Sequence, residues 1–450
     1  MIRKAMQSRT LLTWSAKKID NKAMTARCLP LLALTALGFP QANAAPTPTF
    51  SKDVAPILYE HCATCHRAGE IGPMPLLTYE QARPWAKAIR GAVAQGKMPP
   101  WHATEPRGVF SNDRRLTDAQ RETLIAWADN GAPQGNPKDL PPAPKFSEGW
   151  QIGTPDVVLP MKTAYHVPPD GTIAYQYFEI PTNFTEDKWV QAIEVRPGVR
   201  RVVHHVLVFC KEPGSAKMPQ PVFASVLPKM PFGVGGGGAR GVLIATTAPG
   251  TNAMTFPAGS AILIKAGSTL TLQVHYTANG TGADDQTSVG MVFSKEPPQR
   301  EVHNSAFINA MFTLQPGSPD TEVESMIQFN DASHIWALFP HTHLRGKSWE
   351  YRMLYPDGHS QVVLSVPKYD FNWQTYYQFA TPLAVPKGAI IQAIAHYDNS
   401  ANNPSNPDPK VAVHWGEQTW QEMQYTGITF TVDDQKPAEP TTGGEAHGQK

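Results

Sequence analysis

Short runs of β-branched and aromatic residues, each ended by glycine, proline, asparagine or aspartate, recur between residues 156 and 430. The runs lie at 175–180, 189–195, 202–210, 270–276, 289–293, 335–339, 349–355, 361–366, 389–397 and 410–415. This pattern predicts many short strands joined by turns. The 450-residue chain also carries 43 prolines and 34 glycines, which argues against a helical bundle. We expect a mainly β fold here, and two or three domains overall.

The first 45 residues are expected to be a signal peptide. Arg27 precedes an apolar run at 28–39, and the small-x-small sequence Ala-Asn-Ala follows at 42–44. The run is too short to span a bilayer as a mature helix. Translation could start at Met1 or at Met24. We therefore expect an exported protein, periplasmic or secreted, without stable membrane insertion.

The charge balance excludes one class of partner. The chain has 39 basic and 38 acidic residues, for a net charge of +1. Such a balance gives no electrostatic reason to expect binding to nucleic acid or to an anionic membrane surface.

A C-x-x-C-H sequence at residues 62–66 is the attachment signature of c-type haem. Cys62 and Cys65 would form the two thioethers, and His66 would bind the iron. A redox dithiol would be expected in a βαβ context, and a zinc site would need a second ligand pair nearby, and neither is visible. Cys210 is left over and is predicted to be a buried thiol in a strand.

The residues around this motif predict helices at 50–62, 78–95 and 117–130, the last opened by an S/T-x-x-E/Q capping box. A helical segment of this size around C-x-x-C-H resembles a small class I cytochrome c domain, expected at 48–131. Met98 follows a helix and precedes two prolines, so it is the first candidate for the distal haem ligand, with Met74 and His102 as alternatives. Methionine–histidine ligation suits electron transfer.

Two segments are expected to lack a fold of their own. Residues 132–150 are rich in proline and predict an extended linker. Residues 433–450 are polar and predict a disordered tail.

Three histidines lie in apolar strands of the first half of the β region. His204 and His205 are neighbours in the run at 202–210, and His275 lies in the run at 270–276. An unsatisfied imidazole in an apolar strand is costly, so these residues are candidate metal ligands. Adjacent side chains on a strand point to opposite faces, so joint binding requires a twist, a bulge or different ring nitrogens. The alternative is that these histidines bind no metal and each forms its own hydrogen bonds.

The second half of the β region repeats this arrangement. His341 and His343 are two residues apart, so on a strand they share a face. Met423 stands just before the last apolar run. Two imidazoles with one thioether suit Cu(I) better than zinc. The alternatives are that His341 and His343 are a solvated pair in a turn and that Met423 only fills the core.

These motifs, in this order, resemble the copper type II, ascorbate-dependent monooxygenases, the family of peptidylglycine α-hydroxylating monooxygenase and dopamine β-monooxygenase. The resemblance covers residues 155–430 and implies two antiparallel jelly rolls, at 151–298 and 299–432. It further implies an electron-storing copper on one ligand set and an O₂- and substrate-binding copper on the other, separated by a solvent-filled gap. The sets would be His204, His205 and His275, and then the catalytic His341, His343 and Met423.

One position departs from the family. Phe339 stands where the peptidylglycine-type enzymes place an arginine that holds the substrate carboxylate, so no peptide substrate is implied. Phe339, Pro340, Trp336 and Trp415 suggest a more apolar pocket, although core packing explains them equally well.

The predicted function is a haem- and copper-dependent monooxygenase that hydroxylates an aliphatic C–H of a small molecule with O₂. A periplasmic donor would pass electrons to the haem, and the haem to the copper held by His204, His205 and His275. Two alternatives remain open. One is an electron-transfer or copper-binding protein without hydroxylase activity, and the other is a zinc hydrolase, since three imidazoles can also form a catalytic zinc site.

Overall fold

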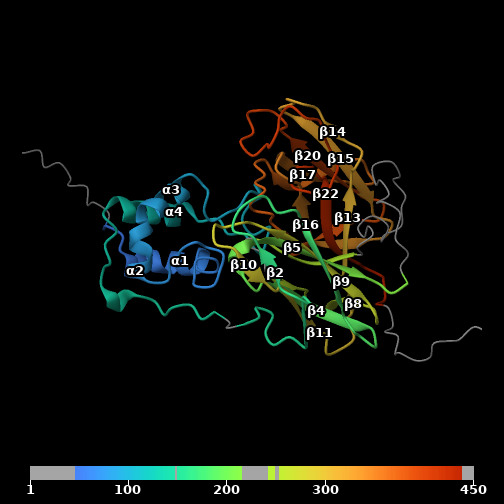
Figure 1. The fold of residues 1–450 in the computed structure, drawn as a ribbon, viewed down its shortest axis with the longest axis horizontal. Coiled ribbons are helices and arrows are strands. Elements are labelled where there is room, and N and C mark those ends of the chain that lie inside the picture. The colour runs from blue at the N-terminus through green and yellow to red at the C-terminus, as the bar shows by residue number, and fades with distance from the viewer. Residues whose placement is uncertain (1–45, 147–148, 215–241, 249–252, 438–450) are drawn as a thin grey trace, which may run out of the picture. The chain divides into compact units, whose positions relative to one another are not determined.

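The computed structural model describes residues 46–146, 149–214, 242–248 and 253–437. The expected signal peptide and most of the expected tail lie outside these residues. The described chain is mainly β, as predicted, with its α-helices before residue 130 (Figure 1). None of the helices in the described part of the chain is both long and apolar enough to cross a bilayer.

The helices form where the sequence predicts them. They are η1 (Phe50–Val54), α1 (Ala55–His61), α2 (Tyr79–Ala82), η2 (Arg83–Trp85), α3 (Ala86–Ala94), α4 (Asp118–Asp129) and the short η3 (Pro137–Asp139). The helix expected at 78–95 is broken by the tighter turn η2, because Pro84 lacks the amide that an α-helix needs there. Thr78 and Thr117 each close a capping box. Phe50, Leu58 and Trp127 lie in the shared core of these helices.

The first group of strands forms two main sheets around one core. Its elements are β1 (Val157–Pro160), β2 (Tyr165–Val167), β3 (Gln176–Pro181), β4 (Lys188–Arg196), η4 (Arg200–Val202), β5 (Val203–Lys211), β6 (Val242–Thr247), β7 (Ala253–Thr255), β8 (Ser260–Ile264), β9 (Thr269–Tyr276), β10 (Ala283–Asp285), β11 (Ser288–Phe293) and β12 (Arg300–Glu301). Among the described residues the sheet orders are β1-β11-β4-β8-β12, with β7 on β4, and β3-β9-β5-β6. We call this unit the first sandwich.

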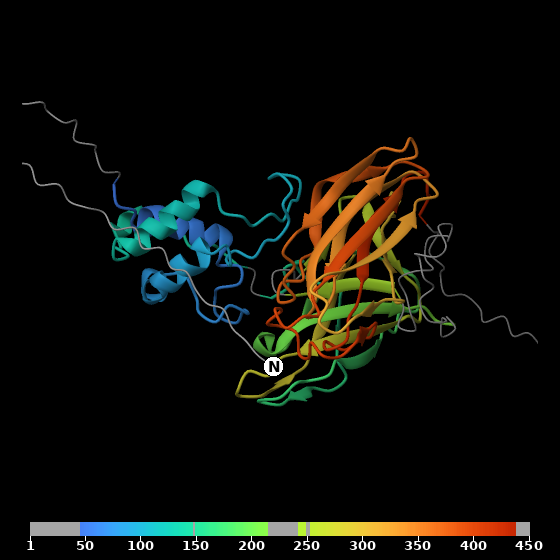
Figure 2. The ribbon, with the colours of Figure 1, turned by 90° about the horizontal axis from the view of Figure 1, so that it is seen from above.

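The second sandwich follows the same plan. Its strands are β13 (His303–Ile308), β14 (Thr313–Leu314), β15 (Thr321–Gln328), β16 (Ser333–His341), β17 (Gly346–Leu354), β18 (Ser360–Val366), β19 (Tyr377–Val385), β20 (Ile390–Tyr397), β21 (Val413–His414) and β22 (Tyr425–Val432). The two main sheets run β13-β22-β16-β19 and β15-β20-β17-β18. Figure 2 shows the strands of the two sandwiches in green to yellow and in orange to red.

The two sandwiches share part of their core. Phe339 and Tyr376 of the second sandwich pack in the hydrophobic cluster of the first. Hydrogen bonds cross between them as well. The amide of Tyr175 donates to Gln418 at 3.1 Å, and the hydroxyl of Tyr177 donates to Glu417 at 3.0 Å. This contact brings the ends of β5, β9 and β16 together, and these ends carry the candidate ligands.

Residues 101–113, which lie within the domain predicted at 48–131, pack on the second sandwich. Trp101 and Phe110 are buried there against Tyr377, with ring centroids 5.2 and 5.5 Å from it. Backbone amides of Thr104 and Ser111 donate to β18 and β19. Large aromatic side chains are most stable out of water, so these rings fix the segment on the sandwich. We call residues 101–113 the strap.

Hydrogen bonds hold the chain near two other predicted boundaries. At the start of the linker expected at 132–150, the carbonyls of Pro133 and Gln134 accept from the amides of Phe50 and Ser51. The tail expected from residue 433 is held at its start, where Asp433 lies 2.6 Å from the ring of His334. A composition-based prediction cannot foresee such single contacts.

Candidate metal centre

The first histidine group lies where β5 and β9 pair. His205 faces His275 across the ladder, and the register shifts between Val203 and His205. This irregularity lets His204 and His205 turn to one side although they are neighbours in sequence. Ligand nitrogens of His204, His205 and His275 all lie within 4.8 Å of one another. The Nδ1 atoms of His204 and His205 are 3.0 Å apart, roughly the separation of two nitrogens bound to one ion at about 2.0 Å each.

Burial keeps these three rings neutral. It lowers the pKa of His204 to about 4 and that of His275 to about 3, and it lowers the pKa of His205 well below its ordinary value. Nε2 of His205 and Nδ1 of His275 are buried without a hydrogen-bond partner. A neutral imidazole with an unpartnered nitrogen is the form that binds a metal ion. The donor set therefore fits a metal.

The second group lies at the end of β16. His341 is the last residue of this strand and pairs with Tyr425, and His343 follows in the next turn. Nδ1 of His341 donates to Oε1 of Gln374 at 2.8 Å, and Nδ1 of His343 donates to the carbonyl of Gln421 at 3.1 Å. Both contacts leave Nε2 as the ligand atom. Nε2 of His343 is buried and has no hydrogen-bond partner.

Burial also governs the protonation of this pair. It lowers the pKa of His341 to about 4, although the hydrogen bond to Gln374 acts in the opposite direction. The pKa of His343 is lowered well below its ordinary value, chiefly by burial and then by the nearby His341. Both rings are therefore neutral and able to act as ligands near neutral pH.

Glu422 shapes the turn that presents His343. Its carboxylate accepts hydrogen bonds from the hydroxyl of Thr342 at 2.6 Å and from the amides of His343 at 2.8 Å and Arg345 at 2.6 Å. Burial raises the pKa of Glu422 to about 7, while these bonds lower it. This role could not be predicted from the sequence, in which Glu422 stands out only as the neighbour of Met423.

Met423 lies next to this turn. The ladder between β16 and β22 ends at the pair His341 and Tyr425, two residues after Met423. The amide of Met423 donates to Glu422 at 3.2 Å, and its carbonyl accepts from the hydroxyl of Tyr397 at 2.7 Å. The backbone of Met423 is therefore held beside Glu422, whose carboxylate also accepts from the amide of His343.

The two groups meet where the sandwiches are in contact. Ring centroids of His205 and His341 are 6.2 Å apart. The buried ring of Tyr175 fills the space between the groups, with centroids 5.5 Å from His205, 4.9 Å from His275 and 6.1 Å from His343. Packing between the sandwiches brings the groups together, and no local sequence pattern encodes it.

A loop at 369–376 also contacts both groups, and no sequence motif marks it. Phe371 stacks on His204 at a centroid distance of 5.3 Å and lies 6.3 Å from His343. Gln374 binds His341, and the hydroxyl of Tyr369 donates to the carbonyl of Thr342 at 3.0 Å. The loop thus holds a ligand of each group in place.

The aromatic residues expected to form an apolar pocket do not form one together. Phe339 is buried in the core and stacks on His341 at 5.8 Å. Trp336 lines a separate cavity of about 320 Å³ that contains none of the candidate ligands. Trp415 forms a β-bridge with Glu422. For Phe339, the core-packing alternative is the correct one.

The C-x-x-C-H motif lies at the end of α1 in a geometry that suits haem. Nδ1 of His66 donates to the carbonyl of Met74 at 3.1 Å, which leaves Nε2 for the iron. Burial raises the pKa of Cys62 to about 12 and raises that of Cys65, so neither is a reactive thiolate. A Cβ on Gly72 would stand 2.6 Å from the carbonyl oxygen of Cys65, so the loop has space there for glycine alone.

The three candidates for the distal ligand differ in position. The carbonyl of Met74 accepts the hydrogen bond from Nδ1 of His66. His102 belongs to the strap, where the charge of Asp370 partly offsets the effect of burial on its pKa. Met98 follows α3, and its amide donates to the carbonyl of Ala92 at 3.3 Å.

Cys210 is a buried, unbridged thiol in β5, as predicted. Burial raises its pKa to about 11, so it is unreactive at neutral pH.

Comparisons with known proteins bear on the fold only weakly. No family model matches the chain, and no curated protein is similar to it at a significant level. Among solved structures, the major capsid protein P2 of bacteriophage PM2 matches with 10% identity and a TM-score of 0.27, over 61% of this chain and 97% of that one. The VP2 subviral particle of infectious bursal disease virus matches with 10% identity and a TM-score of 0.19, over 64% and 75%. A secreted protein from Eubacterium rectale matches with 10% identity and a TM-score of 0.19, over 57% and 69%.

Proposed function

We propose that this chain is an exported monooxygenase that uses two copper ions and one covalently attached haem to hydroxylate an aliphatic C–H of a small molecule. In this proposal the helices around C-x-x-C-H form a class I cytochrome c-like domain, and the two sandwiches are the jelly rolls of a copper monooxygenase. The observation that carries it is the gathering of five histidines at the contact between the sandwiches, of which His205, His341 and His343 are buried and His204 and His275 are half-buried.

The donor set supports copper over zinc. The proposal combines the two imidazoles of the second pair with the thioether of Met423 as third donor, and soft sulfur favours Cu(I). Glu422 is the acid closest to the ligands, and its carboxylate already accepts three hydrogen bonds in the turn. It is therefore poorly placed to act as the general base that a zinc hydrolase requires.

The reaction is R–H + O₂ + 2 e⁻ + 2 H⁺ → R–OH + H₂O. When bound, the copper ions would supply electron storage and O₂ binding, and the haem would supply a one-electron relay. The residues of this chain hold and shield the ligands. Gln374 and the carbonyl of Gln421 fix the second pair of rings, while Tyr175 and Phe371 keep water away from them.

A short chain of contacts connects the strap with the histidines. The charge of Asp370 raises the pKa of His102 in the strap, against the larger effect of burial. Asp370 accepts from the amide and the side chain of Asn372 at 2.9 and 2.8 Å, which holds the turn that carries Phe371. Phe371 in turn stacks on His204. The strap begins shortly after Met98, so these contacts support delivery of electrons from the haem to the first group.

The test has two stages. Haem-loaded protein is first reduced without O₂ and mixed with Cu(II), and the absorbance of the reduced haem is followed. The proposal predicts rapid reoxidation in the wild type and none in the His204→Ala variant. O₂ uptake with formation of a hydroxylated product in a substrate screen then separates a hydroxylase from a protein that only transfers electrons. A reduced haem that stays reduced beside bound copper refutes the proposed electron route.

A further inference from the structure

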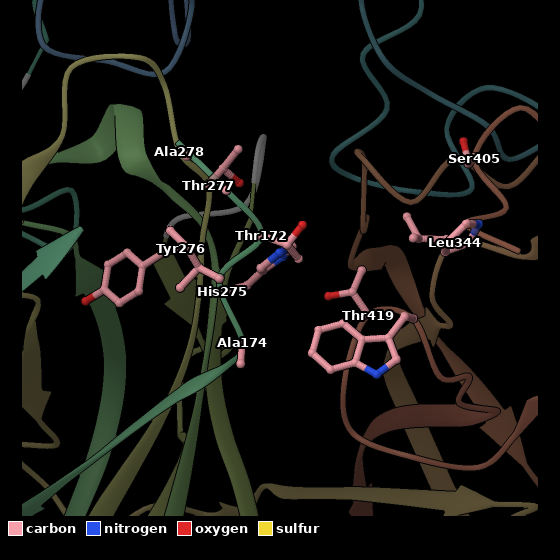
Figure 3. A pocket seen from close by; sticks show the side chains of 13 residues that line it. Thr172, Ala174, His275, Tyr276, Thr277, Ala278, Leu344, Ser405 and Thr419 are labelled. Carbon is pink, nitrogen blue, oxygen red and sulfur yellow. The ribbon is translucent and has the colours of Figure 1, made fainter. Parts of the chain in front are cut away.

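A cavity of about 700 Å³ opens beside the candidate metal centre, between the two sandwiches. Figure 3 shows Thr172, Ala174 and His275 on one wall facing Leu344 and Thr419 on the other. His275 belongs to the first histidine group, and Leu344 directly follows His343 of the second. The cavity is thus lined by a histidine of the first group and by the residue that follows His343, and its volume falls within the range of small-molecule sites, about 300–1,000 Å³.

The described residues that line this cavity include no aspartate, glutamate, lysine or arginine. Its apolar surface comes from Ile173, Leu344 and Trp420, and the indole of Trp420 is 46% exposed. Thr172, Thr277 and Ser405 add hydroxyl groups that can donate or accept hydrogen bonds. Such a wall binds an apolar body and orients it through a few neutral hydrogen bonds.

The nearest buried cation does not serve this cavity. Arg345 is 1% exposed, and its guanidinium donates to Asn399 at 2.8 Å and to the carbonyl of Trp420 at 3.0 Å. It stands behind the backbone of Trp420 and does not line the cavity. A carboxylate or an ammonium group inside would lose its hydration without gaining an opposite charge, which strongly disfavours charged ligands.

From these observations we propose that the cavity is the substrate site, and that it takes an uncharged molecule with an aromatic or aliphatic body and a neutral hydrogen-bonding group. This inference rests on the proposed function and adds the substrate class to it. It excludes amino acids, amines and carboxylates as preferred substrates.

Binding to the copper-free, haem-loaded protein tests this inference separately from catalysis. Three probes share one carbon skeleton and differ in charge, namely 2-phenylacetamide, phenylacetate and 2-phenylethylammonium. Ligand-observed NMR titrations give their dissociation constants. The inference predicts that the amide binds at least tenfold more tightly than either ion. Equal binding of the three probes, or no binding of the amide, overturns it.

Two variants show whether the probe occupies this cavity. Ala174 is exposed and lines the wall, so Ala174→Asp adds a negative charge without disturbing the core. It should weaken amide binding tenfold or more and improve binding of the ammonium probe. Trp420→Ala should weaken amide binding similarly, since it removes the main apolar surface.

Ala119→Asp, on the exposed side of α4, is the matched control and should leave binding unchanged. Amide binding that survives both cavity variants overturns the assignment. Copper binding and O₂ uptake are measured on loaded protein in parallel. A loss of those activities contradicts the proposed function and leaves the result of the binding titration intact.

Discussion

Gly72 stands where the loop after the haem motif has no space for a side chain. A Cβ at this position would lie 2.6 Å from the carbonyl oxygen of Cys65 and 2.8 Å from Nδ1 of His66. Since both are parts of the motif itself, the backbone would have to move before a side chain could fit. The hydrogen bond from His66 to the carbonyl of Met74, which orients the ring, would be disturbed first.

We predict that Gly72→Ala lowers the amount of attached haem and destabilises the helical segment by about 1–3 kcal/mol, the usual cost of overpacking. Haem absorbance per protein and thermal unfolding measure the two effects. Gly91→Ala is the matched control, because Gly91 stands inside α3 and a Cβ added there would meet no atom within 4 Å. The control should gain about 0.5–1 kcal/mol of stability. Equal behaviour of the two variants would contradict this interpretation of the loop.

At the scale of single elements, the turn after β16 depends on Glu422. Its carboxylate satisfies one hydroxyl and two amide donors that would otherwise be buried without acceptors. We predict that Glu422→Ala destabilises the protein by roughly 3 kcal/mol or more, since each orphaned donor costs about 1–3 kcal/mol. The variant should also bind less copper at His341 and His343.

Glu422→Gln keeps the shape of the side chain and part of its acceptor capacity, so its effect should be smaller. Chemical denaturation and metal analysis measure both variants. Glu186→Ala, which removes an exposed partner of Lys188, serves as control and should be close to neutral. If Glu422→Ala leaves stability and metal content unchanged, the turn is not held in the way described.

The strap is a second element with a measurable role. Phe110 is 3% exposed, and its ring lies 5.0 Å from Phe379 and 5.5 Å from Tyr377. We predict that Phe110→Ala costs about 3–5 kcal/mol and raises hydrogen exchange in residues 101–113, while haem attachment stays normal. The exposed Trp85 provides the control variant Trp85→Ala. Unchanged exchange in the strap would contradict its docking on the second sandwich.

The elements differ in how far the sequence predicts them. Periodicity and turn residues predict β4, β9 and β18 to within a residue or two, because strand alternation is a local property. The same signals do not predict β6 or β19, or the placement of Trp101 in a β core. These features depend on contacts between residues hundreds of positions apart, such as that of Ser111 with Gln378.

The candidate site likewise has residues that the sequence predicts and residues that it does not. The five candidate histidines could be named from their motifs. A twist, a bulge or the use of different ring nitrogens was expected if the neighbours His204 and His205 bind together, and the register of the ladder shifts at this point. Gln374, Phe371 and Tyr175 could not be named, since each contributes only through its position in the assembled fold. The merging of two expected sites into one cluster is likewise a property of the contact between sandwiches.

At the scale of the whole molecule, neither sandwich contains the complete candidate site. The first supplies three histidines and Tyr175, and the second supplies His341, His343 and the loop at 369–376. Burial of all these rings requires the sandwiches to stay in contact. Residues of each sandwich then pack against ligands of the other, which favours a rigid centre.

Metal content per haem tests the central claim most directly. Protein is purified without added metal, loaded with copper and analysed for copper, zinc and iron, with an EPR spectrum of the oxidised form. We predict two copper ions for each iron, and the loss of about one in each of the variants His205→Ala and His343→Ala. The exposed His359 supplies the control His359→Ala, which should keep both. Bound zinc in place of copper, or full copper in His205→Ala, would contradict the claim that the five histidines form a copper centre.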